Sequence, residues 1–327
     1  MKAAVVTRAG DAPVYTDFDP PSATAGHVLI DVDACALSHV TRARASGTHY
    51  SSSGGFPFVA GVDGVGRRED GTRVYFFAPR APFGALAERT LVPAANCVVL
   101  PEGLDAHRAA AIAIPGMSSW AALTERAKFV AGETVLVNGA TGASGSLAVR
   151  IAKHLGAATV IATGRRPVRA ALEACGADCV IALDQDESAL RRALEPHFRR
   201  GVDVVLDYLW GPSALTLLTG AAHALPDGYP LRFVQIGSIS GGTLALPAAA
   251  LRASAITLLG SGIGSVAPDR LLRAAGDVLL AAQPAGLAID MQVVALAELR
   301  RYWADAGSRA RIVFTMGTPR GEGTAAR

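Results

Sequence analysis

The chain has 327 residues, of which 50% are hydrophobic and 18% charged, with a formal net charge of +3. This length exceeds one typical core, so we expect two domains, and the composition excludes a disordered or coiled-coil protein. No basic run is interleaved with aromatic residues, which argues against a nucleic-acid-binding surface, and no run of about 18 apolar residues could span a membrane. Arg8 and Asp11 interrupt the first segment before a secretion signal could form, and four cysteines suit a reducing compartment, so we expect a cytoplasmic protein.

The first 115 residues are predicted to be mainly β-structure. Short apolar runs alternate with clusters of Gly, Pro, Asp and Ser, the pattern of short strands joined by turns. The candidate strands are residues 3–6, 28–32, 73–77, 85–92 and 97–100. Residues 48–57 form a glycine- and serine-rich loop, a type of segment that often carries substrate contacts. Residues 105–123 are typical of an alanine-rich helix, which Pro115 and Gly116 should break, and we place the crossing to a second domain there.

A strand, a glycine-rich turn and a helix follow one another between residues 135 and 156. The apolar run ends at Asn138, and apolar residues then recur at helical spacing. The glycines fall at Gly139, Gly142 and Gly145 rather than at the strict G-x-G-x-x-G spacing. Glycine lets the backbone approach a pyrophosphate, and the helix N-terminus offers N–H groups to its charge. An ordinary tight turn is the alternative, but the context predicts dinucleotide binding.

From residue 134 the pattern alternates between strands and helices. Candidate strands are residues 135–138, 159–163, 179–182, 202–207, 233–236 and 255–260, with helices near 144–155, 167–174, 187–199 and 211–223. This alternation predicts a doubly wound parallel sheet.

The segments after Gly264 are too few to form a domain alone. They comprise a helix at 269–282, a strand at 291–294, a helix at 296–306 and a strand at 310–315. We therefore predict a β-rich domain at 1–117, an α/β domain at 118–263, a return to the first domain at 264–317, and a disordered tail at 318–327.

The order of these domains and motifs resembles the medium-chain dehydrogenase/reductase superfamily, within it the zinc-independent quinone oxidoreductase branch. The motifs that carry the resemblance are Gly61-Val-Asp-Gly64-Val-Gly66, residues 115–123, the glycine turn, residues 203–207 and residues 234–238. They run through nearly the whole chain. The resemblance implies an α/β fold in which a Rossmann doubly wound parallel sheet is inserted in a GroES-like β-rich catalytic domain.

Two departures from the zinc-dependent branch predict that no metal is bound. This chain has Ser38 where that branch has a cysteine, and Val62 after Gly61 where it has a histidine. Serine is a poor zinc ligand and valine is none. The four-cysteine structural zinc lobe has no counterpart either, so we expect neither a catalytic nor a structural zinc.

The second strand of the α/β domain indicates which cofactor is bound. An NAD site carries an acid about 20 residues after the glycine turn, but here the strand ends Thr163-Gly164-Arg165-Arg166. Arg165 and Arg166 stand where a 2′-phosphate would lie, which favours NADPH, although solvated loop arginines are the alternative. Other predicted cofactor contacts are Gly139, Thr141, Gly142, Ala143, Ser144 and Gly145 in the turn. Thr163 and Ser144 are expected as secondary phosphate contacts, and Asp184 could lie near the adenine edge or be an ordinary loop acid.

The nicotinamide should lie at the carboxyl ends of the later strands. This position implicates the backbone of Ile236, Gly237, Ser238 and Gly262. The resemblance adds Ser118 near the nicotinamide and Arg311 in a closing strand.

The candidate catalytic residues are Ser38, His39, Thr41 and Tyr50. Without zinc, hydrogen-bond donors must stabilise the charge that hydride transfer leaves on oxygen. His39 could also deliver a proton, but an ordinary surface histidine fits the sequence equally well. Tyr50 could donate a hydrogen bond or merely pack its loop, and solvent could supply the proton instead.

These features predict an NADPH-dependent, zinc-independent reductase of a quinone or an α,β-unsaturated carbonyl compound. An aldehyde, ketone or enoyl-thioester reductase is an alternative, and so is a redox sensor that binds NADPH without turnover. We expect a small-molecule carbonyl or quinone substrate and no nucleic-acid or membrane partner. The resemblance also suggests a homodimer, in which a strand within residues 245–262 pairs across a two-fold axis.

Overall fold

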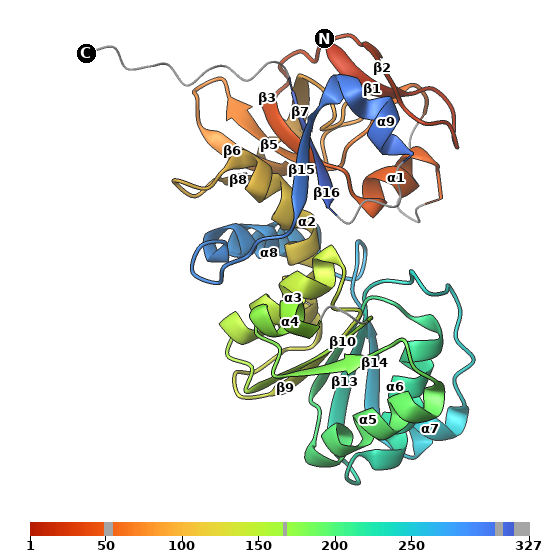
Figure 1. The fold of residues 1–327 in the computed structure, drawn as a ribbon. Helices are drawn as coiled ribbons and strands as arrows, with labels where there is room; N and C mark the ends of the chain where they lie inside the picture. The colour runs from red at the N-terminus through yellow and green to blue at the C-terminus, as the bar shows by residue number, and fades with distance from the viewer. Residues whose placement is uncertain (49–54, 166–168, 305–309, 317–327) are drawn as a thin grey trace. The chain divides into compact units, whose positions relative to one another are not determined.

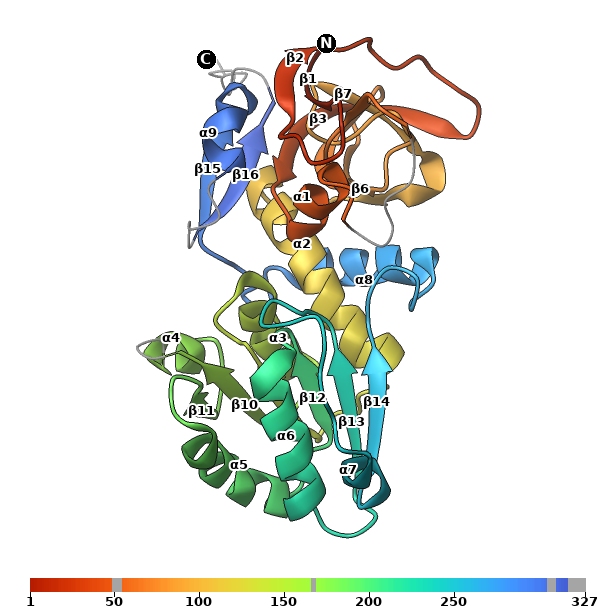
Figure 2. The ribbon, with the colours of Figure 1, turned by 90° about the vertical axis from the view of Figure 1, so that its right-hand side faces the viewer.

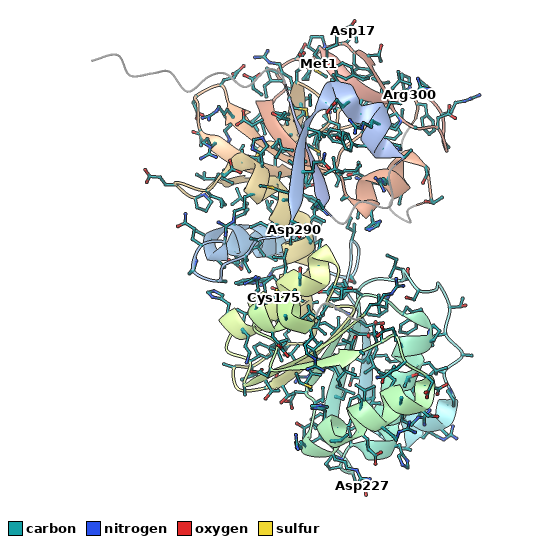
Figure 3. All side chains as sticks on the ribbon, viewed as in Figure 1. Met1, Asp17, Cys175, Asp227, Asp290 and Arg300 are labelled. Carbon is teal, nitrogen blue, oxygen red and sulfur yellow. The ribbon has the colours of Figure 1, made fainter. Side chains whose placement is uncertain are left out.

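The computed structural model describes residues 1–48, 55–165, 169–304 and 310–316, and the chain divides into two compact units (Figure 1). Met1–Ala111 and Asp290–Arg327 form the first unit, and Ile112–Ile289 form the second. Asp290, labelled in Figure 3, begins the segment that returns to the first unit. This return starts later than residue 264, where the sequence analysis placed it. None of the described helices is both long and apolar enough to cross a membrane.

The first unit is built on two β-sheets. Within the described residues, the larger sheet has the order β15 (Met291–Ala295), β16 (Arg311–Thr315), β3 (His27–Ala36), β5 (Asp63–Arg68), β6 (Arg73–Phe77) and β8 (Cys97–Val99), with β7 (Arg89–Pro93) also paired to β3. The smaller sheet has the order β2 (Val14–Asp17), β1 (Lys2–Val6) and β4 (Phe58–Val59). The returning strand β16 pairs antiparallel with β3, so segments from both ends of the sequence share one core.

Two predictions for the first half of the chain were wrong in detail. Residues 85–92 do not form one strand, because only Arg89–Pro93 is a regular strand. The buried residues before Arg89 follow Gly84, where the backbone comes very close to another segment. A Cβ at Gly84 would lie 2.1 Å from the carbonyl oxygen of Val59. The predicted helix break is also wrong: α2 (Ala106–Ala121) continues through Pro115 into a π-helical turn, Ala122–Arg126. A proline removes only one helical N–H donor, and this helix accommodates the loss.

The later helix α8 (Pro268–Ala281) belongs to the second unit rather than to the return segment. It packs closely against α2, since a Cβ at Gly116 would lie 2.6 Å from Cγ1 of Val278. Glycine therefore permits an approach that any larger residue would prevent.

The second unit is the predicted doubly wound sheet (Figure 2). Within the described residues, its parallel strands have the order β11 (Cys179–Ala182), β10 (Thr159–Gly164), β9 (Thr134–Asn138), β12 (Val204–Asp207), β13 (Pro230–Gln235) and β14 (Ala255–Gly260). The helices between them are α3 (Ala143–His154), α4 (Arg169–Ala174), α5 (Glu187–Arg200), α6 (Gly211–Ala224) and α7 (Ala248–Arg252). Helices α5 and α6 bury Leu194, Phe198 and Leu217 against one face of the sheet. The strand order reverses beside β9, which is where open α/β sheets bind their ligands.

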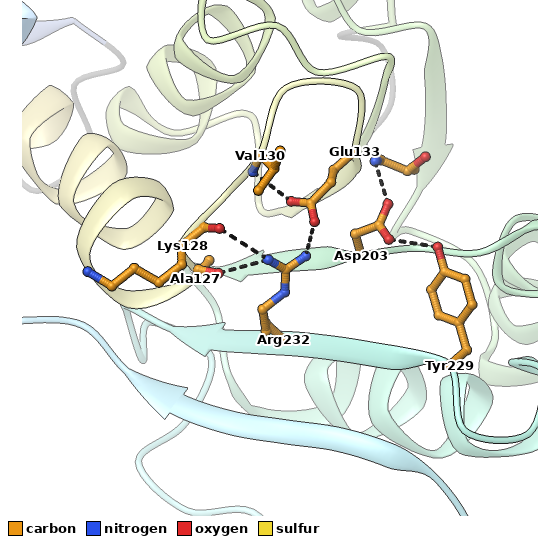
Figure 4. Close-up of polar contacts among 8 residues, drawn as sticks. Ala127, Lys128, Val130, Glu133, Asp203, Tyr229 and Arg232 are labelled. Atoms are coloured by element: carbon orange, nitrogen blue, oxygen red, sulfur yellow. Dashed lines mark hydrogen bonds and ion pairs between the residues drawn. The ribbon is translucent and has the colours of Figure 1, made fainter.

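A polar network joins strands at the amino edge of this sheet (Figure 4). Arg232 of β13 forms an ion pair with Glu133 at 2.6 Å. It also donates to the carbonyl oxygens of Ala127 and Lys128. Asp203 accepts hydrogen bonds from the N–H of Thr134 and the hydroxyl of Tyr229, both at 2.7 Å. Partial burial and the Asp203 carboxylate raise the pKa of Tyr229 to about 12, so this hydroxyl stays protonated. The network ties the starts of β9, β12 and β13 together.

We expect Arg232→Met to lower the free energy of unfolding by about 2 kcal/mol, because Glu133 would stay largely buried after losing its partner. Both side chains are only 21–22% exposed. Thermal denaturation measures the effect, with Arg191→Met as the matched control. Arg191 pairs with Glu187 on the surface of α5, where both side chains are at least 44% exposed, and its loss should cost less than about 0.5 kcal/mol. Equal losses in the two variants would contradict the role given to the network.

Candidate functional site

The glycine turn connects β9 to α3 in a form that suits a phosphate ligand. Gly139 has φ +88°, a conformation that side-chain-bearing residues rarely adopt. Gly145 lies against the turn, since a Cβ there would be 2.3 Å from the carbonyl oxygen of Gly139. Gly142 is the N-cap of helix α3 and offers no side-chain hydrogen bond to it. Thr141 and Gly142 are both exposed. The N–H groups of its first turn, at Ala143, Ser144 and Gly145, therefore have no acceptor within the helix and can bind an anion.

The end of β10 provides a cation beside this turn. Arg165 is exposed directly after β10. Together with Arg169 and the residues of β11, it lines a cavity of about 670 Å³. The predicted partner Arg166 lies outside the described residues. Asp184 is exposed after β11. No acid ends β10, so the ribose-binding carboxylate of an NAD site is missing from this strand.

Thr163 is not a phosphate contact of the predicted kind. Thr163 is fully buried, and its hydroxyl donates to Oδ1 of Asn138 at 2.7 Å. Oγ1 of Thr163 also accepts the N–H of Gly139 at 3.1 Å. These bonds engage its hydroxyl proton inside the protein, so Thr163 supports the turn instead of meeting the ligand.

In the loops predicted to meet the nicotinamide, three backbone N–H groups already donate hydrogen bonds within the protein. Ile236 and Gly237 both donate their N–H groups to the carbonyl oxygen of Asp207, at 2.8 and 3.1 Å. Gly262 donates its N–H to Oγ of Ser265 at 2.8 Å. Main-chain donation from these three residues to a carboxamide is therefore not available in this conformation, whereas Ser238 is exposed at the end of the first loop.

Ser119 contacts the glycine turn, whereas the predicted Ser118 does not. The hydroxyl of Ser118 donates to the carbonyl of Pro115 within its own helix at 2.9 Å. Oγ of Ser119 lies 3.1 Å from the carbonyl oxygen of Ser144 and 2.7 Å from the hydroxyl of Tyr208. Ser118 was predicted from the family resemblance, whereas in the structure it is the adjacent serine, Ser119, whose hydroxyl reaches the turn.

In the first unit, Ser38 and Thr41 form a buried hydroxyl pair at the start of α1 (His39–Ala45). Oγ of Ser38 accepts the N–H of Thr41 at 3.0 Å and lies 2.9 Å from its hydroxyl oxygen. His39 is exposed, and partial desolvation, aided by Arg42 and Arg311, lowers its pKa below 6.5. The neutral imidazole that results at pH 7 is a poor proton donor, which favours the hydroxyl pair. Tyr50 lies outside the described residues.

The residues at the positions that hold zinc in the zinc-dependent branch do not fit a zinc ion. Ser38 already caps α1, and the buried side chain of Val62 carries no donor atom. Across the described ranges, no group of three or more His, Cys, Asp or Glu side chains is arranged to hold a metal. Zinc independence stays a prediction.

A cavity of about 790 Å³ lies beside the hydroxyl pair in the first unit. Its walls include Thr41 and Arg44 of α1 and the rings of Phe56, Phe58 and Phe83. The centroids of Phe56 and Phe58 are 5.5 Å apart, with the rings tilted by 45°. Aromatic walls of this kind suit a flat apolar ligand with one polar end.

The first unit also contains a buried polar cluster that the sequence analysis missed. It consists of Asp63 on β5, Tyr75 on β6, Cys35 on β3 and Arg311 at the start of β16. Asp63 and Tyr75 are fully buried, and Nε and Nη2 of Arg311 are enclosed by protein. Burial raises the pKa of Asp63 to about 7, although the Arg311 guanidinium acts in the opposite direction. A contact between Arg311 and a cofactor stays a prediction.

Asp63 should make the stability of the protein depend on pH. The carboxyl titrates at about 7 in the folded chain and at about 3.8 when exposed, so the folded state holds its proton more tightly. The free energy of unfolding should therefore fall as pH rises from about 4 to about 7, by up to a few kcal/mol. Urea titrations across this range measure the slope, which Asp63→Asn should flatten. The control is Asp17→Asn, which removes an exposed ion pair with Lys2 and should leave the slope of stability against pH nearly unchanged (Asp17 is labelled in Figure 3). An unaltered slope in Asp63→Asn would refute the raised pKa of Asp63.

Comparisons with known proteins place the chain in a family. Residues 143–279 match the family model described as zinc-binding dehydrogenase. The chain is 33% identical over 322 residues to a probable NADPH-dependent quinone reductase, tdiC, of Emericella nidulans, covering 84% of this chain and 88% of that protein. The chain therefore belongs to the medium-chain dehydrogenase/reductase superfamily, in its quinone oxidoreductase-like branch.

Two further relatives are informative. A crystal structure of the quinone oxidoreductase from Thermus thermophilus, also solved with NADPH, superposes with a TM-score of 0.77 at 28% identity, covering 96% of this chain and all of that one. The acrylyl-CoA reductase AcuI of Ruegeria pomeroyi is 32% identical over 165 residues, which span 46% of this chain and 50% of that protein. The predicted fold, a Rossmann sheet inserted in a GroES-like β-rich domain, is confirmed by these matches and by the strand order.

Proposed function

We propose that this protein is an NADPH-dependent reductase that transfers a hydride to a quinone or an α,β-unsaturated carbonyl compound. The observation that carries the proposal is the uncapped glycine turn at α3 together with Arg165 at the end of β10, where an NAD site would have an acid. Arginine matches a 2′-phosphate with charge-assisted hydrogen bonds. The NADPH-dependent relatives support the same cofactor.

Bound NADPH would supply the hydride, and the chain's own residues would stabilise the oxygen that becomes negatively charged. Ser38 and Thr41 share one hydrogen bond between their hydroxyls, so one of the two protons remains for a ligand. Because Thr41 lines the aromatic cavity, we assign that second proton to its Oγ1, where it can meet a substrate carbonyl. No described side chain is required as a proton donor, and solvent can protonate the product.

The substrate class follows from the cavity in the first unit. Its phenylalanine rings favour a planar, conjugated compound over a small saturated aldehyde. The relative that reduces acrylyl-CoA keeps an enoyl thioester as the second candidate.

We also propose that the protein is a cytoplasmic homodimer. Strand β14 ends its sheet and pairs, within the described residues, on one side only. Leu258 of β14 and Leu251 of α7 are 40% and 41% exposed, so a second copy would cover apolar surface as well as backbone groups. Sedimentation of the wild type and of Leu258→Glu tests this: we expect a dimer and a monomer respectively, and a monomeric wild type would exclude it.

The function is tested by measuring the oxidation of NADPH and of NADH with 1,4-naphthoquinone and with a simple enone, in the presence of a metal chelator. We expect saturable, protein-dependent oxidation of NADPH and much slower oxidation of NADH. NADPH binding without turnover would favour the sensor alternative. Activity that the chelator abolishes would show that zinc is required.

A further inference from the structure

Buried polar side chains form a connected row at the carboxyl edge of the second unit's sheet. The parallel register places Asn138 of β9 opposite both Thr163 of β10 and Asp207 of β12, and all three residues are fully buried. Thr163 donates to Oδ1 of Asn138 at 2.7 Å, and Nδ2 of Asn138 donates to Oδ1 of Asp207 at 2.8 Å. Since the N–H of Gly139 donates to Thr163, this row lies directly under the glycine turn.

The carboxylate of Asp207 also organises the turn that follows β12. It accepts the N–H of Leu209 at 3.1 Å and the N–H of Trp210 at 3.1 Å. Trp210 has φ +58°, which is strained for a residue with a side chain and persists only where the surroundings hold it. The side chain of Leu209 then lies over Gly139, since a Cβ on that glycine would be 2.7 Å from Cγ of Leu209. The turn after β12 therefore covers the glycine turn.

The backbone of Asp207 holds a third segment. Its carbonyl oxygen accepts the N–H groups of Ile236 and Gly237, and the carbonyl of Leu209 accepts the N–H of Ser240 at 2.9 Å. Strands β9, β12 and β13 are parallel, so the loops that follow them lie at the same edge of the sheet, where Figure 2 shows the ends of β12 and β13. These loops are thus connected through one residue.

We infer that Asp207 is the positioning residue of the dinucleotide site, and that its carboxylate acts on the glycine turn through Asn138, Leu209 and Trp210. The inference rests on the proposed function, but it concerns the geometry of the loops themselves and requires no contact between Asp207 and a ligand. Three N–H bonds, from Leu209 and Trp210, and one bond from the Asn138 amide converge on its carboxylate. Removing this side chain would therefore free the turns after β9 and β12, which must be ordered again when a nucleotide binds. A preordered site binds more tightly because this ordering is already complete.

The test measures the NADPH dissociation constant by nucleotide fluorescence, at a temperature well below the melting point of every variant. Asp207→Ala should raise the constant about tenfold or more, an effect expected when positioning is lost. Asn138→Asp should do the same, because it would place two carboxylates 2.8 Å apart. Adding Asp207→Asn to Asn138→Asp removes that repulsion and should recover at least fivefold of the lost affinity.

The matched control is Asp203→Asn, at the other end of the same strand. Asp203 also accepts two hydrogen bonds, from Thr134 and Tyr229, but lies at the amino edge of the sheet. The Asp203→Asn variant should have a lower melting temperature than the wild type, but its NADPH dissociation constant should stay within about twofold of the wild-type value. If Asp203→Asn weakens NADPH as much as Asp207→Ala, the role of Asp207 is only structural and the inference fails.

The remaining outcomes separate the inference from the proposed function. A wild type that does not bind NADPH overturns the proposed function. A wild type that binds, with Asp207→Ala and Asn138→Asp binding equally well, overturns the inference alone. If Asp207→Ala does not fold, Leu209→Ala decides: a raised NADPH constant supports the inference, and an unchanged one contradicts it.

Discussion

Gly145→Ala should raise the NADPH dissociation constant by about tenfold or more and lower the melting temperature as well. The added Cβ would lie 2.3 Å from the carbonyl oxygen of Gly139 and 2.7 Å from Cα of Ala140, so the backbone of the glycine turn must move. Backbone atoms cannot relieve the clash as the end of a flexible side chain could. A displacement of about 1 Å in a binding turn is enough to lose one to two orders of magnitude in affinity or rate.

The matched control is Gly220→Ala in α6. A Cβ there would lie 3.7 Å from the ring of Phe198, an ordinary contact, and alanine is the better helix former. This variant should bind NADPH as the wild type does and be at least as stable. Fluorescence titration and thermal denaturation measure both properties. Wild-type affinity in Gly145→Ala would mean that the turn is not the phosphate site.

Arg165→Gln should reduce the preference for NADPH over NADH, expressed as the ratio of kcat/KM values, by about 10- to 100-fold. A hydrogen bond to a charged group contributes about 1.5–3 kcal/mol, and NADH lacks the phosphate that Arg165 would bind. Because Arg165 is exposed, the variant should keep its stability. Activity with NADH should be almost unchanged, which distinguishes lost selectivity from general damage.

Arg169→Gln is the control for Arg165→Gln, because it removes the same charge from the same cavity. Arg169 donates to the carbonyl of Val180 and pairs with Glu173, so its position is set by the protein rather than by a ligand. Its loss should leave the preference for NADPH within about threefold. If Arg169→Gln alone abolished the preference, the 2′-phosphate would lie at Arg169 instead.

The sequence was sufficient where the information is local. The strands at residues 179–182 and 255–260 were predicted with the bounds that the structure has, because apolar runs between turn residues mark short strands. The glycine turn was recognised for the same reason, since strand, turn and helix are consecutive. The helix through Pro115 shows the limit of local rules: the packing of α2 against α8 outweighs one missing hydrogen bond.

The sequence was insufficient where residues meet across strands. Asn138, Thr163 and Asp207 are neighbours only because β9 lies between β10 and β12, and no local pattern encodes that order. Thr163 was therefore assigned to a ligand, although the register turns its hydroxyl toward Asn138. The cluster around Asp63 was missed in the same way, because β3, β5, β6 and β16 each contribute one residue to it.

One edge of β14 has no partner strand among the described residues, and this has a consequence for handling the protein. Its six residues, AITLLG, include no charge and no proline, the features by which exposed strands usually resist pairing with unrelated chains. A copy separated from its partner would therefore present a template for disordered association. Dilution or mild denaturant that splits the proposed dimer should produce aggregates before it produces unfolded monomers, and the rate of loss should depend on protein concentration.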